Sequence, residues 1–444
     1  MNAPRPRGAE GRGTLFTLIR GFRRNLLTAL PERLYTAWMA EFRSPLIHSF
    51  FCNDPALLRE ILQDRAGDFP KSRRMIEGLA PLLGNGVFIS TGEDWAHQRR
   101  IIDPAFEGGR VRHAYPSILE AARAAAARLP RGPTDIEPQA AHASADVIFR
   151  TLFSVPVEHA LAAGIFEAFR QHQEAQPLVN LAALIPLPRW LPRPHSRRTR
   201  QTAARIRGLI AQLVADRQAA IADGTAPDDL ATKIMTTPDP QTGRCFTPAE
   251  MVDQVAVLFL AGHETSASVL AWALWLLAAH PEWQDRVATE ARLLGPDFGC
   301  VAQLRDTRAV FREALRLYPA VAMFAREATQ PTRFRNRDVP RGAQLVVSPW
   351  HLHRHTRLWD QPDRFDPGRW DRPETKTSAR TAYLPFSAGP RACPGAGLAM
   401  VEGVVMLAAI TGAHRMAPTD RIPAPVARLT IRSDDGIIIE LEPR

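Results

Sequence analysis

The sequence predicts a mainly α-helical protein with a small β subdomain. Most segments carry apolar residues at helical spacing with polar faces between them, and the clearest are 54–63, 114–129 and 197–224. Runs typical of strands are few and short, and the two clearest are 343–349 and 436–442. A long apolar segment follows residue 247, which predicts one helix through the middle of the molecule.

The flanking residues indicate where this long helix starts and ends. Thr247 can cap the helix, Pro248 suits its first turn, and Glu250 closes a capping box with Thr247. Pro281 ends the helix near His280, so it spans about 33 residues and about 50 Å at 1.5 Å per residue. A membrane-spanning helix is disfavoured by four polar residues within the segment, Asp253, Gln254, His263 and Glu264.

The composition is that of a soluble globular protein, with 45% hydrophobic and 23% charged residues among 444. Lysine plus arginine exceeds aspartate plus glutamate by 56 − 46 = 10, but the arginines are spread along the chain without a nucleic-acid-binding module. Nucleic-acid binding is therefore disfavoured. The positive net charge is best explained by solvated helix faces, and the second explanation is an acidic protein partner. The cysteines are too far apart for a zinc site or a disulfide framework and fit a reducing cytoplasm: Cys52, Cys245, Cys300 and Cys393.

Two segments depart from the helical pattern. We expect a basic, amphipathic N-terminal segment at 1–45, followed by a single domain at 46–444. The first segment predicts neither a transmembrane anchor nor a signal peptide and leaves peripheral membrane contact open, because arginines interrupt its apolar run at Arg20, Arg23 and Arg24. Five prolines at 177–194 forbid a continuous helix there, so this apolar segment is either a connector packed on its own domain or a lid over an entrance for apolar substrates.

The stretch AGHETS, residues 261–266, stands in the middle of the predicted long helix. Gly262 costs about 1 kcal/mol in a helix interior, and a buried carboxylate at Glu264 costs more unless it has a partner. A glycine lets a large group approach the backbone, while Glu264 and Thr265 supply a carboxylate and a hydroxyl. The alternative is a kinked core helix with a structural salt bridge.

A second motif, REALRLYP, places Glu313 and Arg316 three residues apart on one helix face, where they can pair. The segment WDQPDRFDPGRW offers Arg364 in a loop as a third member. A carboxylate held by two guanidinium groups forms a rigid bidentate clamp. Taken alone, such a pair is also common on protein surfaces, where it contributes little.

The third motif, FSAGPRACPG, surrounds Cys393 with glycine, proline and arginine. Pro394 and an apolar helix at about 395–411 follow, so we expect the thiol at a helix N-terminus, where the dipole and the nearby arginine lower its pKa. A thiolate in a glycine-rich loop suits a soft or borderline metal such as haem iron. The alternative, a small buried structural cysteine, does not explain the flanking pattern.

Taken in this order, the motifs resemble those of the cytochrome P450 family of haem-thiolate monooxygenases. FSAGPRACPG is similar to the family's F-x-x-G-x-R-x-C-x-G, AGHET to its oxygen-activation motif, and EALR to its E-x-x-R motif. PDRF at 362–365 resembles the loop that completes the clamp, and WAHQR at 95–99 resembles the W-x-x-x-R of the helix beside the haem. The resemblance covers about residues 50–442 and implies the family's fold, with a long central helix over haem b.

The resemblance also implies roles for single residues. Cys393 would be the axial iron ligand, whose thiolate favours O–O cleavage. Glu264 and Thr265 would manage the protons that the reaction consumes. The other haem contacts would be Trp95, Arg99, Arg326 and Arg391 at the propionates, Ala261 and Gly262 against the ring, and Phe386 and Gly395 in the cysteine loop. The structural clamp would consist of Glu313, Arg316 and Arg364.

The implied reaction inserts one oxygen atom of O2 into an apolar substrate, by hydroxylation or epoxidation. The chain ends soon after its last predicted strand, so electrons would come from a separate ferredoxin or flavodoxin-type donor, which Arg99, Arg100, Arg110 and Arg112 could steer. The W-x-x-x-R pattern resembles that of fatty-acid and terpenoid or carotenoid hydroxylases and favours long apolar substrates. The substrate pocket would be lined by Val257, Leu258, Ala261, Val269, Val321, Ala322, Phe324 and Ile437.

Three other classes of protein remain open. A peroxide-driven haem peroxygenase or a lipid-hydroperoxide isomerase would share the fold, although such enzymes tend to lose the acid–alcohol pair that Glu264 and Thr265 form here. A non-catalytic haem protein that senses or carries gas would need neither a proton relay nor an electron donor. A helical interaction protein without a cofactor explains neither the glycine in the long helix nor the cysteine loop.

Overall fold

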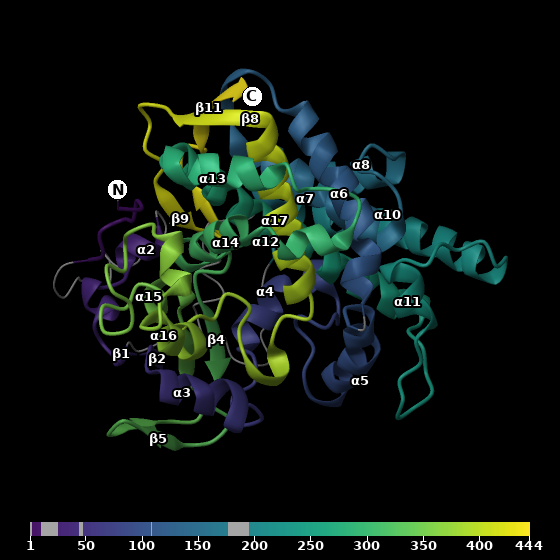
Figure 1. Ribbon diagram of the computed structural model, residues 1–444. Coiled ribbons are helices and arrows are strands. Elements are labelled where there is room, and N and C mark those ends of the chain that lie inside the picture. The colour runs from purple at the N-terminus through teal and green to yellow at the C-terminus, as the bar shows by residue number, and fades with distance from the viewer. Residues whose placement is uncertain (1, 10–24, 44–47, 108, 176–194) are drawn as a thin grey trace.

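Helix α12 (Pro248–Ala278) runs through the middle of the molecule in the computed structural model, which describes residues 2–9, 25–43, 48–107, 109–175 and 195–444 (Figure 1). It begins at the predicted capping box, because the Thr247 hydroxyl accepts from the Glu250 amide at 3.3 Å and the Glu250 carboxylate accepts from the Thr247 amide at 2.8 Å. Most of its side chains are buried, which confirms the prediction of a central helix.

The other helices surround α12 and bury apolar side chains against it or against one another. The longer ones are α6 (Arg110–Arg128), α7 (Ile136–Phe153), α8 (Ala160–Ala175), α10 (Arg197–Ala222), α14 (Arg305–Leu317) and α17 (Ala396–Ala413). The shorter ones are α2 (Leu26–Ala29), α3 (Pro55–Arg59), α4 (Arg73–Leu83), α5 (Gly92–Ile102), α11 (Leu230–Thr236), α13 (Pro281–Ala291), α15 (Pro349–Leu352) and α16 (Thr375–Thr381). Single turns lie at Glu32–Tyr35, Glu60–Asp64, Asp103–Ala105, Phe298–Ala302, Pro367–Asp371 and Gly389–Arg391.

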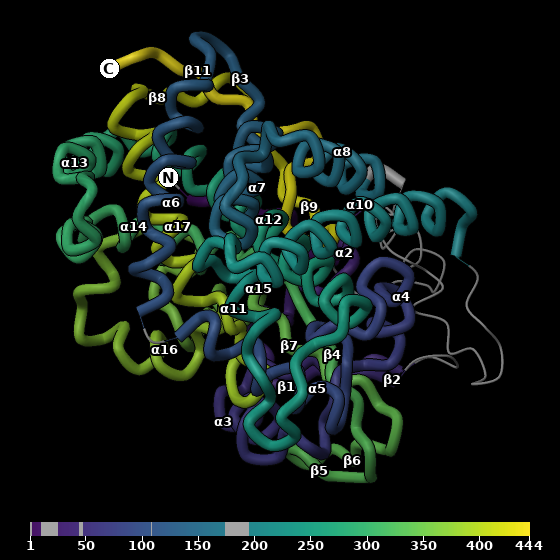
Figure 2. The backbone as a smooth tube through the Cα atoms, turned by 90° about the vertical axis from the view of Figure 1, so that its right-hand side faces the viewer, coloured from purple at the N-terminus to yellow at the C-terminus, as the bar shows by residue number. Residues whose placement is uncertain are grey.

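The β structure is minor, which confirms the predicted fold class. A four-stranded sheet has the order β1 (Met39–Arg43), β2 (His48–Cys52), β7 (Gln344–Val347) and β4 (Phe324–Glu327), and Figure 2 shows it at the lower end of the molecule. The pair β2–β7 is parallel and the other two pairs are antiparallel. A three-stranded sheet has the order β3 (Gly132–Asp135), β11 (Ile438–Pro443) and β8 (His414–Pro418); the hairpins are β5 (Thr332–Phe334) with β6 (Arg337–Val339) and β9 (Pro425–Ala427) with β10 (Ile431–Ser433).

The described parts of the first 45 residues pack against the same body as the rest of the chain. The expected boundary after residue 45 falls between the paired strands β1 and β2, where Met39 lies opposite Cys52. Ala3 is buried, and its amide donates to the Asp363 carbonyl at 2.8 Å. The apolar segment at 177–194, for which we weighed a connector against a lid, lies outside the described residues.

Two described helices, α12 and α17, are long and apolar enough to cross a membrane by length and composition. In their most apolar windows, 78% and 56% of the residues are buried inside the protein, as in the core helices of soluble proteins. The length and composition of these two helices are therefore weak evidence for a membrane span.

Candidate active site

One stripe of α12 stays accessible although most of the helix is buried. Ala261 is exposed, and Leu258, Gly262 and Thr265 are half-buried, which places the accessible residues at i, i+3, i+4 and i+7. The Thr265 hydroxyl donates to the Ala261 carbonyl one turn earlier. This stripe includes Ala261 and Gly262, and their expected contact with the haem ring stays a prediction.

Gly262 also lies where α7 packs closely against α12. A Cβ atom at this position would displace the side chain of Ile148 on α7. The packing of α7 therefore favours a glycine here, and the approach of a cofactor at Gly262 stays a prediction. The sequence could not indicate this, because Ile148 lies more than 100 residues away.

The loop of Cys393 is held in one shape by its backbone. The Cys393 amide donates to the Phe386 carbonyl at 3.0 Å. Gly389 has a φ of +70°, and a Cβ atom there would overlap the Leu62 carbonyl, so no other residue fits. Gly395 precedes the first turn of α17, and its amide donates to the sulfur.

The prediction of a lowered thiol pKa at Cys393 is wrong in its net direction. The sulfur is accessible to water yet lies deep in the molecule, and this burial raises the pKa of the thiol. The Gly395 amide and the charges of Arg99 and Lys71 oppose the shift without reversing it. A metal cation at the sulfur would itself favour the thiolate.

Four cationic side chains lie near Cys393. Arg326 comes from β4, Arg99 from α5 and Arg391 from the cysteine loop, while Lys71 forms an isolated backbone bridge with Arg326. Arg99 donates to the Ala392 carbonyl at 2.8 Å and pairs with Asp103 at 2.7 Å, which ties α5 to the cysteine loop. Lys71 was not predicted, because only the tertiary structure brings it to this place.

These cations form a site that suits a dianionic group. In the described part of the chain, no ion pair involves Lys71, Arg326 or Arg391. Burial lowers the pKa of Arg326 to about 10, and burial together with the charges of Arg326 and Arg99 lowers the pKa of Arg391 to about 10. Two carboxylates of a bound ligand would compensate these charges, so the predicted propionate contacts fit a haem, with the Arg391 guanidinium 3.9 Å from the Trp95 ring centroid.

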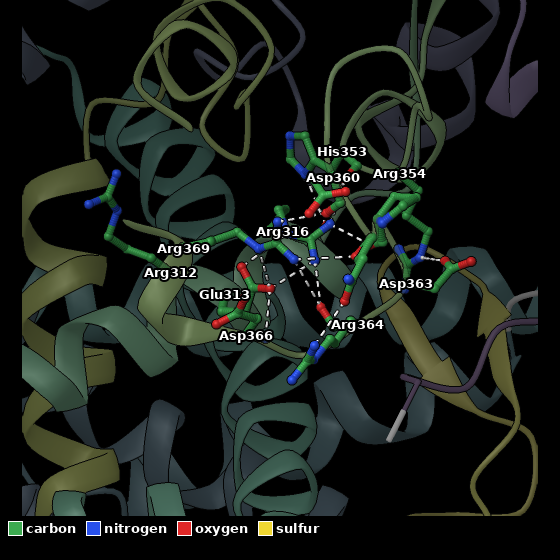
Figure 3. A network of polar contacts seen from close by, with 12 residues as sticks. Arg312, Glu313, Arg316, His353, Arg354, Asp360, Asp363, Arg364, Asp366 and Arg369 are labelled. Carbon is green, nitrogen blue, oxygen red and sulfur yellow. Dashed lines mark hydrogen bonds and ion pairs between the residues drawn. The ribbon is translucent and has the colours of Figure 1, made fainter. Parts of the chain in front are cut away.

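The predicted clamp exists, but with a different third member (Figure 3). Glu313 and Arg316 are both fully buried and paired at 2.8 Å. Arg369, in the turn Pro367–Asp371, pairs with Glu313 at 2.9 Å. The expectation of Arg364 is wrong: its guanidinium is bound to Gln361, and only its carbonyl faces the clamp, where it accepts from Arg316 at 3.1 Å. The loop turns at Gln361, whose φ is +41°, and so points the Arg364 side chain outward.

Glu264 and Thr265 adjoin in sequence but have separate partners. The Glu264 carboxylate is buried and accepts from Thr430 at 2.7 Å and from Arg432 at 2.8 Å and 3.1 Å. Thr265 instead belongs to the accessible stripe described above. The acid and the alcohol predicted as a pair therefore lie on different faces of α12.

The predicted pocket residues divide into two groups. Leu258 is half-buried on the stripe, Val321 is exposed, and Phe324 is half-buried in β4. Four others are buried in the hydrophobic core, and their place in the substrate pocket stays a prediction: Val257, Val269, Ala322 and Ile437. The burial of Ile437 follows from its backbone, which bonds to Ile136 and Asp135 at the start of α7. Among the described residues, further large apolar side chains are exposed that the sequence did not indicate: Phe88, Leu293, Ile422 and Leu429.

A buried carboxyl of α17, Glu402, contacts the same region of α12. Ser266 donates to its Oε2 atom at 3.0 Å. Burial raises the pKa of Glu402 to about 8, and hydrogen bonding lowers it only in part. This carboxyl is therefore protonated near neutral pH.

We expect the Glu402→Gln variant to lose part of the pH dependence of stability. The native state keeps a proton that the unfolded state releases between the ordinary pKa of 4.5 and the folded value of about 8. The free energy of unfolding therefore falls as pH rises through this window, by up to about 1.4 kcal/mol per pH unit. Denaturant unfolding at several pH values should show that the free energy of unfolding of the variant depends less on pH, and that its gain over the wild type is larger near pH 8 than near pH 5. Equal pH dependence in the two proteins would contradict this. Glu282→Gln, which changes an exposed residue of α13, is the control.

Comparisons with known proteins point to a single family. The family model described as cytochrome P450 matches residues 25–429. Cyclooctatin synthase of Streptomyces melanosporofaciens is 33% identical over 392 residues, which cover 85% of this chain and 83% of that protein. Cyclooctat-9-en-7-ol 5-monooxygenase of the same species is 33% identical over 390 residues, with 86% and 83% covered. The crystal structure of the cytochrome P450DA haem domain superimposes with a TM-score of 0.81 at 22% identity, covering 100% of this chain and 98% of that one.

Proposed function

This chain belongs to the cytochrome P450 family, and on that premise we propose that it hydroxylates or epoxidises an apolar substrate of terpenoid or fatty-acid type. As a member it is a monooxygenase, and its cofactor is haem b. The proposed reaction places one atom of O2 in a C–H or C=C bond and releases the other as water. It consumes two electrons and two protons from outside the protein.

The residues around Cys393 divide the work of holding the cofactor. The Cys393 sulfur would bind the iron, and Arg326, Arg391 and Lys71 would bind the propionates with Arg99 beside them. Haem, when bound, supplies the redox chemistry that activates O2. The observation that carries the proposal is the group of Lys71, Arg326 and Arg391, which have no carboxylate partner in the described part of the chain, around one accessible thiol.

Thr265 is the polar side chain that the accessible stripe offers to this reaction. Because its own proton is donated to the Ala261 carbonyl, the Oγ1 atom offers lone pairs to this face and can accept a hydrogen bond from a water molecule that donates protons. Ala261 beside it is apolar, which leaves the hydroxyl as the polar group of this face. We propose Thr265 as the residue that holds a proton at its Oγ1 atom during turnover.

The apolar substrate class rests on the exposed side chains near this face. Val321 and Leu429 are exposed, and the hydrogen bond from the Ile431 amide to the Ala320 carbonyl at 2.9 Å brings their segments together. A relative with 33% identity is named for a monooxygenase that acts on cyclooctat-9-en-7-ol. Both observations favour a large, mostly hydrocarbon substrate with few polar groups.

A separate ferredoxin or flavodoxin-type protein is proposed as the electron donor. The arginines expected to steer it are already engaged: Arg100 pairs with Asp239, Arg110 with Asp228, and Arg112 lies over Phe298. Helix α6 still carries four arginines against one glutamate, so it keeps a positive charge, whereas the two arginines of α5 are balanced by Glu93 and Asp94. The four cysteines are all free, which supports a reducing, cytoplasmic location.

We expect Thr265→Ala to lower product formation by about tenfold to a hundredfold while electrons are still consumed, because a positioned proton donor contributes an effect of this order or more. NADPH-driven turnover with surrogate ferredoxin and flavodoxin systems, on diterpene hydrocarbons and long-chain fatty acids, measures product and hydrogen peroxide together. Thr265→Ser keeps the hydroxyl and should retain most of the product yield. An unchanged product yield in Thr265→Ala would refute the role of this hydroxyl, and turnover with peroxide alone would favour a peroxygenase.

A further inference from the structure

A second face of α12 binds the β9–β10 hairpin. Glu264, Ser268 and Trp272 follow one another at i, i+4 and i+8, so they share one face of the helix. The Ser268 hydroxyl donates to the Ile431 carbonyl at 2.6 Å, and the Trp272 indole donates to the same carbonyl at 3.1 Å. The hairpin therefore lies along this face, one turn of helix away from Glu264.

The Glu264 carboxylate continues this row of contacts toward the tip of the hairpin. Its Oε1 atom accepts from the Thr430 hydroxyl at 2.7 Å and from Arg432 Nε at 3.1 Å, and its Oε2 atom accepts from Arg432 Nη2 at 2.8 Å. Gln173, near the end of α8, also donates to Oε2. One carboxylate thus joins three elements, α12, β10 and α8, through a two-pronged guanidinium pair and two further donors.

This environment suits a fixed anion better than a proton carrier. Burial by itself would raise the pKa of Glu264, but the Arg432 charge and the Thr430 hydroxyl lower it below the ordinary value. Arg432 is itself held on its other side, 4.0 Å from the Glu137 carboxylate of α7. A group that shuttles protons needs a pKa near the working pH and a free path to the acceptor, and Glu264 has neither.

We infer that Glu264 is a positioning residue, which fastens the β9–β10 hairpin and the end of α8 to the central helix beside the substrate. The hairpin tip carries Leu429, which directly precedes Thr430 in the sequence. Leu429 is 48% exposed. Holding Thr430 and Arg432 thereby sets the place of an apolar wall of the site. The inference rests on the proposed function only in taking the hairpin tip as a border of the substrate.

Hydrogen–deuterium exchange of the haem-loaded protein tests the inference without turnover. In Glu264→Gln we expect amides at 428–433 to exchange about tenfold to a hundredfold faster, the size expected when hydrogen bonds to a charged group are lost. Arg432→Gln should give the same increase, and the double variant should add little, because both changes remove one shared interaction. Glu402→Gln replaces another buried carboxyl group that contacts α12, through Ser266 and not through the hairpin, so its exchange at 428–433 should match the wild type. Wild-type exchange in Glu264→Gln would overturn the inference.

Spectral titration with 4-phenylimidazole, an apolar iron ligand, gives a second readout. We expect Glu264→Gln and Arg432→Gln to weaken its binding together, with Arg432→Lys between them and the wild type because lysine keeps the charge but loses the two-pronged contact. If Glu264 carried protons instead, Glu264→Gln would lower the turnover number and leave both hairpin exchange and azole affinity unchanged. If Glu264→Gln does not load haem, Arg432→Lys still tests the contact. Failure of the proposed oxidation would show in turnover alone and would leave the exchange result intact.

Discussion

Replacing Cys393 by alanine is expected to abolish the thiolate-type spectrum and the monooxygenase activity together. The wild-type protein, reduced with dithionite and exposed to carbon monoxide, should show a strongly red-shifted Soret band, because a thiolate donates electron density to the iron. The variant should lose this band, and its turnover should fall to background. Absorption spectra and haem content measured on the same preparations distinguish a lost ligand from a lost cofactor.

A second accessible cysteine provides the matched control for this experiment. Cys245 is exposed in the loop before α12 and is far from the cysteine loop in sequence. Cys245→Ala should keep the red-shifted band and full activity. A red-shifted band that persists in Cys393→Ala would show that another residue binds the iron, and the absence of haem from the wild-type protein would end the proposed function.

The Arg369→Ala variant is expected to have the largest effect on stability. Glu313 is fully buried, and removing Arg369 leaves its carboxylate with one guanidinium, Arg316, in a site without water access. Breaking one partner of a buried ion pair costs about 3 to 5 kcal/mol. Denaturant unfolding should show a loss of this size, with less haem retained, since only α16 and a short segment separate this turn from the cysteine loop.

The neighbouring arginine tests which loop residue holds the clamp. Arg364 lies in the same loop, but its guanidinium contacts Gln361 and its side chain is outside the clamp (Figure 3). Arg364→Ala should therefore change the free energy of unfolding by less than about 1 kcal/mol, as for other exposed side chains. Equal losses in the two variants would place both side chains in the clamp, and a larger loss in Arg364→Ala would restore the assignment made from the sequence.

Short-range patterns predicted the fold and the centre of the site because their causes act within a few residues. The capping box at Thr247 fixes the start of α12, and proline and glycine fix the shape of the Cys393 loop. The spacing of Glu313 and Arg316 puts them on one helix face whatever surrounds the helix. These features were readable from the sequence by itself, as was the mainly helical fold class.

Features that depend on contacts between distant segments were decided only by the tertiary structure. The loop conformation chose Arg369 over Arg364, the packing of α7 favours Gly262, and the hairpin near the C-terminus takes up the charge of Glu264. The pKa of Cys393 followed the same rule, because burial outweighed the local helix end and the nearby cations. A sequence specifies which groups are available and how each is held locally. Which partner a side chain meets, and how far it is from water, depends on segments hundreds of residues apart that meet only in the folded chain.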